Sequence, residues 1–242
     1  MLPIVLLFLW LLYGHLSMTK TIQAVLFDLD GTLLDTAPDM AEAANRVLAD
    51  YGHGPLTAPQ IKANTSYGAK GLLSAGFGVI PPHLELLELR QEFLDYYQQN
   101  ICVGTSIFQG ICQLLSYLEQ QGIPWGIMTN KPRYLTDMLL PFFPELLKAQ
   151  AIVCGDTLAL AKPHPEPLLY ASKILGVDHD RCAYIGDIEK DMIAARAANM
   201  HRYIAGWGYI GESHTPEHWE AHGILQTPEA FITTLKSQNE RK

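Results

Sequence analysis

The chain of 242 residues is long enough for one large domain or for a core domain with a smaller second one. Its hydrophobic share of 48%, against 17% charged residues, excludes a disordered chain and supports a sizeable buried core. The formal net charge of -8 argues against a nucleic-acid partner, and it requires that any anionic substrate be met by local cationic groups or a metal.

The N-terminal segment is apolar from Leu2 to Tyr13, and Met18 follows shortly afterwards. This run is shorter than the roughly 20 residues of a membrane span, and it lacks the basic region and cleavage site of a secretory signal. Residues 1–17 are therefore an extension upstream of a start at Met18, a short membrane anchor, or an export signal. We favour the first, and expect a cytoplasmic protein with no stable membrane partner and reduced cysteines.

Short apolar runs, each ending in a polar or glycine-bearing turn, predict strands that are buried on both faces. These runs are Ile22–Phe27, Ile123–Met128, Ala151–Cys154, Cys182–Ile185 and Arg202–Ala205. Between them, apolar residues recur at helical spacing in Gly110–Gln121, Pro167–Leu175 and Lys190–Asn199. The alternation predicts an α/β fold with a doubly wound parallel sheet, a Rossmann-like core.

The stretch from Ala37 to about Thr105 interrupts this alternation, because it contains no strand pattern. Helices are predicted over Pro38–Asp50, Thr57 to about Ser74, and His83–Asn100, and the pair Pro81-Pro82 separates the last two. We therefore expect a helical domain at residues 37–105, inserted into a core formed by residues 18–36 and 106–242.

The first predicted strand runs directly into two carboxylates, Asp28 and Asp30, followed by Gly31. The period of two along a strand places both on one side, at the edge where open α/β sheets bind ligands. Adjacent carboxylates repel each other unless a cation is present, and a divalent metal would also neutralise phosphate oxygens. Asp28 can attack phosphorus as a nucleophile, and Asp30 can protonate the leaving oxygen. The alternative is a solvated turn after a strand.

Two further strand ends carry polar groups suited to a phosphate. Thr129 and Asn130 follow the second strand, where a hydroxyl and the next backbone N–H can bind a phosphate oxygen. Lys162 lies in a proline-rich turn, where an ammonium can neutralise the transferring group. Taken singly, each feature also fits an ordinary structural role, as a polar strand end with an N-cap or as a surface lysine.

Asp187 follows another buried strand, and Asp191 lies one helical turn later. This pairing suits one direct metal ligand and one group that holds a metal-bound water. The structural alternative is an N-cap followed by an acidic residue in the first turn of a helix. The joint occurrence of all these groups at strand ends favours a catalytic site over a set of coincidences.

In this order, the motifs resemble the four signature motifs of the haloacid dehalogenase-like hydrolase superfamily, from about Thr21 to near Pro228. The resemblance implies a nucleophile at Asp28 and a general acid/base at Asp30, and aspartate at both positions favours phosphoryl transfer over dehalogenation. It also implies that Thr129 and Asn130 bind the phosphoryl group, which Lys162 neutralises.

The same resemblance implies a Mg²⁺ cofactor. Its ligands would be Asp28, the backbone carbonyl of Asp30, and Asp187, with Asp191 supporting the ion through water. Ile188 departs from the pattern, because many relatives carry a second aspartate there. That departure bears on the water-mediated shell and leaves Asp187 unaffected.

Within the superfamily, the chain most resembles the phosphoglycolate phosphatase group, and inside it the N-acetylmuramic acid 6-phosphate phosphatases of peptidoglycan recycling. The residues that carry this likeness are Leu34–Asp39, Lys162–Leu168, Gly208–Ile210 and Trp219. The implied protein is a monomer or homodimer that hydrolyses a small phosphorylated metabolite. The expected substrate is N-acetylmuramic acid 6-phosphate or 2-phosphoglycolate.

The predicted helical insertion matches the cap of this family, which closes over the site and supplies specificity. The segment Ser66–Gly71 is the candidate substrate loop, with Gly68 allowing close backbone approach and Lys70 reaching an anionic group. A solvated helical position for Lys70 is the alternative. Two other functions also stay open: a sugar-phosphate mutase of the β-phosphoglucomutase kind, and a non-catalytic metabolite-binding protein on the same fold.

Overall fold

The computed structural model describes residues 21–80 and 85–240 of the chain. A six-stranded sheet forms its centre, and every strand pairing in that sheet is parallel. The strands are β1 (Ala24–Phe27), β4 (Trp125–Met128), β5 (Ala151–Val153), β6 (Cys182–Gly186), β7 (His201–Ala205) and β8 (Gly223–Leu225). Their order, β5-β4-β1-β6-β7-β8, confirms the predicted α/β fold with a doubly wound sheet.

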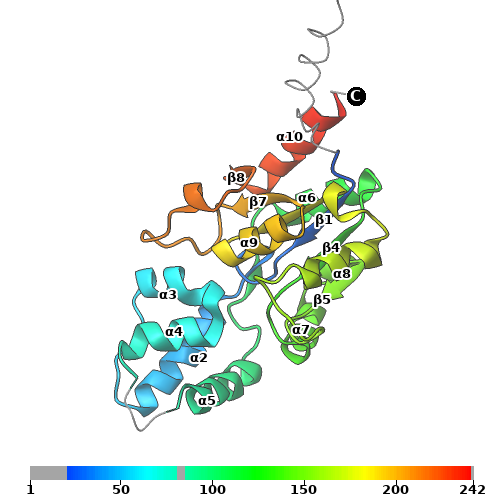
Figure 1. Ribbon diagram of the computed structural model, residues 1–242. Coiled ribbons are helices and arrows are strands. Elements are labelled where there is room, and N and C mark those ends of the chain that lie inside the picture. Colours follow the sequence, from blue (N-terminus) through cyan, green and yellow to red (C-terminus); the bar gives the residue numbers. More distant parts are fainter. Residues whose placement is uncertain (1–20, 81–84, 241–242) are drawn as a thin grey trace, which may run out of the picture.

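Helices cover both faces of this sheet (Figure 1). The α8 and α9 helices pack on β4, β5, β6 and β7, while α6 and α10 pack against each other on the opposite face. The bounds are α6 (Ile111–Gln120), α7 (Arg133–Leu139), α8 (Glu166–Leu175), α9 (Glu189–Ala197) and α10 (Pro228–Asn239). Short 3-10 turns complete the layers: η2 (Leu140–Phe142), η3 (Leu146–Lys148), η4 (His179–Arg181) and η5 (Pro216–His218).

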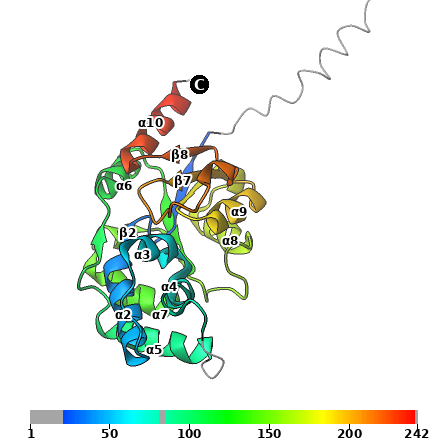
Figure 2. The same cartoon turned by 90° about the vertical axis from the view of Figure 1, so that its left-hand side faces the viewer.

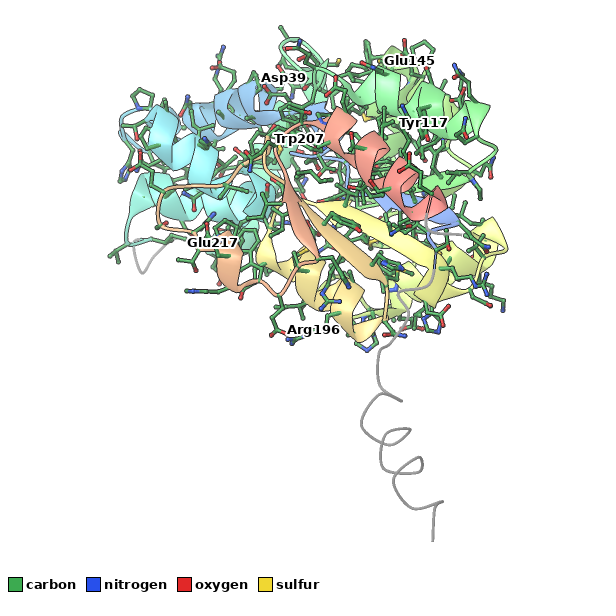
Figure 3. The ribbon with its side chains drawn as sticks, turned by 90° about the horizontal axis from the view of Figure 1, so that it is seen from above. Asp39, Tyr117, Glu145, Arg196, Trp207 and Glu217 are labelled. Atoms are coloured by element: carbon green, nitrogen blue, oxygen red, sulfur yellow. The ribbon has the colours of Figure 1, made fainter. Side chains whose placement is uncertain are left out.

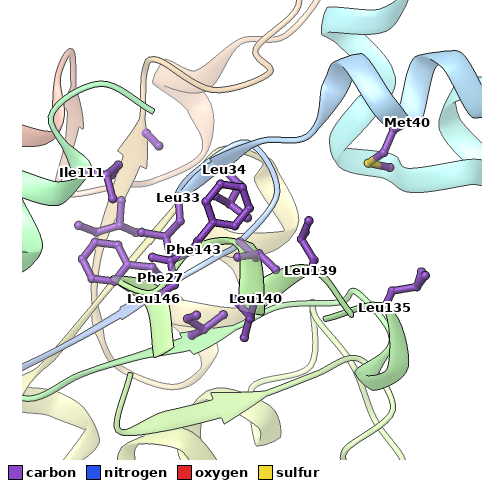
Figure 4. Packing of buried hydrophobic residues seen from close by; sticks show 14 of the residues in the cluster. Phe27, Leu33, Leu34, Met40, Ile111, Leu135, Leu139, Leu140, Phe143 and Leu146 are labelled. Carbon is purple, nitrogen blue, oxygen red and sulfur yellow. The ribbon is translucent and has the colours of Figure 1, made fainter. Parts of the chain in front are cut away.

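The alternation of β1 side chains divides the core in two. Val25 and Phe27 join the cluster on the α6 side, whereas Ala24 and Leu26 join the cluster under α8 and α9. Figure 4 shows Phe27 packed among aliphatic side chains from the green helical segments. Burying one such side chain contributes about 1.5–3 kcal/mol, so both layers hold β1 rigidly up to its carboxyl end.

Four helices form a separate group beside the sheet, which we call the helical unit (Figures 1 and 2). It consists of α2 (Ala37–Asp50), α3 (Ala58–Asn64), α4 (Gly68–Phe77) and α5 (Leu86–Gln99), with the 3-10 turn η1 (Thr65–Tyr67) between α3 and α4. The α2 helix packs against both α4 and α5. The single helix predicted from Thr57 to about Ser74 is therefore wrong, because η1 separates α3 from α4 and ends at Gly68, which has φ of 66°.

Two short strands join the sheet to the helical unit. They are β2 (Leu34–Asp35), where the chain enters the helical unit, and β3 (Ser106–Ile107), where it leaves. The two strands pair antiparallel. The Asp39 carboxylate, near the start of α2, accepts hydrogen bonds from the backbone N–H groups of Val103, Gly104 and Thr105 (Figure 3). The outgoing and returning segments are thus tied together, a feature that the sequence pattern did not predict.

The expectations about the N-terminal extension and about Pro81-Pro82 lie outside the described residues. Among the residues that the structure does describe, no helix combines the length and apolar character needed to cross a bilayer.

Candidate active site

The strand order changes direction around β1, because the chain passes from β1 through β4 to β5 and then returns to β6 on the other side. Such a switch point opens a crevice at the carboxyl ends of the strands. Asp28 follows β1, Thr129 follows β4, and Asp187 follows β6. The predicted site residues therefore come from adjacent strand ends.

Three of the predicted acidic residues lie together, and we call them the acidic group. Oxygens of Asp28, Asp187 and Asp191 all lie within 4.8 Å of one another, and all three residues are buried. Asp191 lies in the first turn of α9, which starts at Glu189. The Asp191 Oδ2 accepts a hydrogen bond from the backbone N–H of Ile188 at 3.2 Å, which holds the carboxylate in this position. Burial raises the pKa of Asp28 to about 7, and the nearby charges of Asp191 and Asp30 add to the rise.

Asp187 is fully buried, which raises the pKa of its carboxyl well above its usual range. Its Oδ2 accepts hydrogen bonds from the Ser66 hydroxyl at 2.6 Å and from the Tyr209 backbone N–H at 2.9 Å. Its Oδ1, in contrast, has no hydrogen-bond partner among the described residues. A buried carboxylate oxygen without a partner, next to two further carboxylates, suits a hard divalent cation such as Mg²⁺.

The loop that follows β1 requires a glycine where it passes the Asp187 carboxylate. Gly31 has φ of 79°, and a Cβ there would lie 2.2 Å from Asp187 Oδ2. A side chain would therefore displace the carboxylate as well as strain the backbone.

Lys162 supplies the opposing charge. Its Nζ lies 3.0 Å from Asp28 Oδ1 and 2.8 Å from Asp191 Oδ1, and it donates to the Tyr184 hydroxyl at 2.7 Å. Burial lowers the pKa of the ammonium, but the two carboxylates raise it by more, so Lys162 stays protonated. It therefore offsets part of the negative charge of the acidic group, as its place in the sequence suggests.

The two residues after β4 divide their roles. Thr129 is buried beside the crevice, and its hydroxyl accepts the backbone N–H of Lys131 at 3.2 Å. The Asn130 side chain donates to the Lys162 carbonyl at 2.9 Å and accepts the Lys162 N–H at 3.0 Å. Asn130 thus fixes the backbone of Lys162, and its own backbone N–H remains the predicted contact to a phosphate.

Asp30 stands apart from the three clustered acids. Its Oδ1 lies 3.1 Å from the Nζ of Lys131, a buried lysine that was not predicted as a site residue. The same Nζ donates to the hydroxyl of Tyr97 in α5, at 2.9 Å. Lys131 thereby connects the candidate acid/base to the helical unit.

A cavity of about 210 Å³ lies between the sheet and the helical unit. Its lining includes the predicted residues Asp28, Asp30, Gly68, Lys70, Thr129, Asn130 and Lys162. Arg90, Phe93 and Lys190 also face it, and these were not predicted. Lys70 and Arg90 form no ion pair with any residue in 21–80 or 85–240. The site thus has an acidic floor and a rim that carries unpaired cationic side chains.

Comparison with known proteins agrees with this geometry. Residues 25–205 match the family described as haloacid dehalogenase-like hydrolase. The chain is 41% identical to a phosphoglycolate phosphatase of Xanthomonas campestris pv. campestris over 209 residues, which cover 85% of this chain and 93% of that protein. It is 37% identical to an N-acetylmuramic acid 6-phosphate phosphatase of Pseudomonas aeruginosa over 214 residues, covering 88% and 95%.

The fold also has close counterparts among solved structures. A protein described as a predicted phosphoglycolate phosphatase from Haemophilus somnus 129PT superimposes with a TM-score of 0.78 at 22% identity. The match covers 89% of this chain and 98% of that one. The same arrangement of strands and helices is therefore built from widely different sequences.

Proposed function

The chain belongs to the haloacid dehalogenase-like hydrolase family and is a phosphatase, and on this premise we propose that it is Mg²⁺-dependent and acts through an aspartyl-phosphate on Asp28. The observation that carries the proposal is the placement of Asp28 at the cavity, 3.0 Å from Lys162 and grouped with Asp187 and Asp191. The proposal also takes the helical unit as a cap over this cavity.

Asp28 is the nucleophile. Its Oδ1 receives both the Leu29 backbone N–H, at 2.8 Å, and the Lys162 ammonium, so the other carboxylate oxygen is left to attack phosphorus. That attack forms a P–O bond to Asp28 as the ester P–O bond breaks. Lys162 neutralises charge that develops on the phosphoryl oxygens.

Asp30 moves the protons. In the first half-reaction its carboxyl group gives a proton to the leaving oxygen of the substrate alcohol. In the second, the resulting carboxylate takes a proton from water as the water oxygen attacks phosphorus. The aspartyl-phosphate bond then breaks, releasing inorganic phosphate and restoring both carboxyl groups to their starting states.

The residues that would hold Mg²⁺ are Asp28, Asp187 and the backbone carbonyl of Asp30, with Asp191 as a supporting group. Asp187 would bind through Oδ1, which has no hydrogen-bond partner in the described part of the chain. When bound, the ion would neutralise the clustered carboxylates and the phosphoryl oxygens. The Thr129 hydroxyl and the Asn130 backbone N–H would orient the phosphoryl group at the cavity floor.

For the substrate, we propose 2-phosphoglycolate or N-acetylmuramic acid 6-phosphate, the molecules for which the two relatives are named. Both carry a carboxylate in addition to the phosphate. The cationic side chains of Lys70, Arg90 and Lys190 line the cavity of a chain with a net charge of -8, which supports a substrate with a second anionic group. Of these three side chains, only the guanidinium of Arg90 can bind a carboxylate through two parallel hydrogen bonds.

Phosphate release tests the proposal directly. The protein would be assayed with and without Mg²⁺ on 2-phosphoglycolate, N-acetylmuramic acid 6-phosphate, glucose 6-phosphate and β-glucose 1-phosphate. We expect Mg²⁺-dependent release, fastest from a carboxylate-bearing ester. Isomerisation of β-glucose 1-phosphate without phosphate release would instead identify a mutase, and no reaction at all would support a binding protein.

The substrate assignment has its own variant. Arg90→Gln should raise KM for the carboxylate-bearing ester about 10-fold or more, and change KM for glucose 6-phosphate by much less. Arg46→Gln is the matched control, because Arg46 lies on the same helical unit but pairs with Glu42 on the surface. Equal effects of Arg90→Gln on both substrates would argue against carboxylate recognition.

A further inference from the structure

The carboxylate of Asp187 is held by hydrogen bonds from two separate parts of the chain. Its Oδ2 accepts one from the Ser66 side chain and another from the Tyr209 backbone. Both bonds go to the same oxygen, while Oδ1 has no partner among the described residues. The bonds therefore orient the carboxylate so that one oxygen is anchored and the other is available to a cation.

Ser66 belongs to the helical unit, where it lies in η1 between α3 and α4. This turn is seated on the sheet-bearing part of the molecule. The Tyr67 ring lies 6.1 Å from the His214 ring and 5.4 Å from the Lys190 ammonium. A Cβ on Gly211 would come within 2.5 Å of the Ala63 Cβ, so the two backbones approach closely. The Ser66 bond to Asp187 thus exists only while η1 is docked.

Tyr209 makes a second connection to the helical unit. Its backbone N–H binds Asp187, while its hydroxyl donates to Asp35 Oδ1 at 2.7 Å and accepts the Ala37 N–H at 2.8 Å. Asp35 ends β2 and Ala37 begins α2, so these residues form the passage from the sheet into the helical unit. These two connections between the helical unit and the rest of the molecule therefore both end at the Asp187 carboxylate.

We infer that the docking of the helical unit and the binding of a divalent cation are coupled through the Asp187 carboxylate, with Ser66 as the positioning residue. The inference rests on the proposed function, because it takes Asp187 as a cation ligand. Groups that hydrogen-bond a ligating carboxylate typically account for 10–100-fold in metal affinity. Here one such group, the Ser66 hydroxyl, comes from the helical unit, whereas Asp187 follows a strand of the sheet.

The coupling is reciprocal by thermodynamic necessity. If a docked η1 increases the affinity for the cation, the bound cation favours the docked position by the same factor. Cation loading would then prepare the closed arrangement before chemistry begins, and undocking to release product would loosen the ligand. Ser66, the first residue of the candidate substrate loop, is assigned to this coupling as well.

The experiment measures Mg²⁺ binding by calorimetry on the full chain, without substrate. Ser66→Ala should raise the Kd for Mg²⁺ about 10-fold or more. Ser74→Ala, a serine on α4 of the same helical unit that lies outside the cavity lining, should change it by less than about 2-fold. Tyr209→Phe retains the backbone bond to Asp187 but loses the hydroxyl contacts, so a smaller increase is expected.

The reciprocal arm is hydrogen exchange of peptides that cover residues 58–77. Mg²⁺ should slow exchange there in the wild-type protein, and much less in Ser66→Ala. Binding of Mg²⁺ to Ser66→Ala with the wild-type Kd would overturn the coupling while leaving the phosphatase proposal intact. A wild-type protein that binds no Mg²⁺ would overturn the metal site and the coupling together.

Discussion

The ammonium of Lys131 lies 3.1 Å from the carboxylate of Asp30, in a place where both line the cavity. The same ammonium donates to the Tyr97 hydroxyl and lies 4.6 Å from the centre of the Tyr97 ring. Burial lowers the pKa of Lys131, but Asp30 and Tyr97 raise it by more, so the lysine stays charged. The Asp30 carboxylate is therefore positioned by the Lys131 ammonium, which is in turn held by Tyr97 of the helical unit.

Lys131→Met tests this role, because methionine fills similar space without the charge. We expect kcat/KM to fall about 10- to 100-fold for an alkyl phosphate, whose leaving oxygen needs the proton from Asp30. The loss should be smaller for p-nitrophenyl phosphate, whose leaving group is stable as an anion. Lys148→Met, at an exposed ion pair with Glu119, is the control. Equal losses on the two substrates would point to phosphate binding by Lys131 in place of positioning of Asp30.

The residues at strand ends could be predicted because their positions depend on local pattern. Asp28, Thr129 and Asp187 each follow an apolar run whose strand register places them at one edge of the sheet. Once the sheet was predicted to be parallel, their proximity followed. The resemblance to known motifs predicts the roles of these residues, while the family match establishes the family alone.

The contacts that escaped prediction depend on how the helical unit lies against the sheet. The Ser66 hydroxyl contacts Asp187 across 121 positions of sequence, and Tyr97 contacts Lys131 across 34. No periodic pattern encodes those contacts, because they are set by the packing of the helical unit against the rest of the molecule. The sequence does offer a signal for Lys131, because it is the third polar residue in a row after β4. It also offers one for the end of η1, because Gly68 interrupts an otherwise helical pattern.

Gly31→Ala separates backbone strain from damage to the acidic group. The substitution should lower the free energy of unfolding by at least about 1–2 kcal/mol, the cost of the positive φ alone. It should also weaken Mg²⁺ binding markedly, because the new Cβ would meet Asp187 Oδ2. Gly52→Ala is the matched control, with φ of 75° and nothing within 4 Å of the added Cβ.

Chemical unfolding and calorimetry distinguish the two glycine variants. Gly52→Ala should lose only the cost of the positive φ, Gly31→Ala should lose at least that much, and only Gly31→Ala should lose affinity for Mg²⁺. Wild-type Mg²⁺ affinity in Gly31→Ala would show that the Asp187 carboxylate can move aside without cost.

Asp28→Asn should abolish phosphate release while preserving the fold. Burial raises the pKa of Asp28, so its ionised form is unfavourable in the metal-free protein, and the neutral amide removes that cost. The melting temperature without Mg²⁺ should therefore be equal to or above that of the wild type. Asp95→Asn, at an exposed position on α5, should leave both activity and melting temperature unchanged. Substantial turnover by Asp28→Asn would exclude the aspartyl-phosphate.

The raised pKa values also predict how stability depends on pH and Mg²⁺. Asp28 has a pKa of about 7 in the folded protein, and an aspartate in the unfolded chain has a pKa of about 3.9. Between these values the folded state binds more protons, so the free energy of unfolding of the metal-free protein falls as pH rises from about 4 to about 7. Asp187 shifts in the same direction and adds to this loss.

Mg²⁺ should reverse that loss, because it binds the deprotonated carboxylates of the folded protein only. The increase in melting temperature on adding saturating Mg²⁺ should thus be larger at about pH 8 than at about pH 5.5, where protons compete for the same oxygens. In Asp187→Asn, both the pH dependence and the Mg²⁺-induced increase should shrink, since one buried acid and one ligand are gone. An equal Mg²⁺-induced increase at the two pH values would mean that the ion binds away from the buried acids, and the acidic group would then lose its assignment as the metal site.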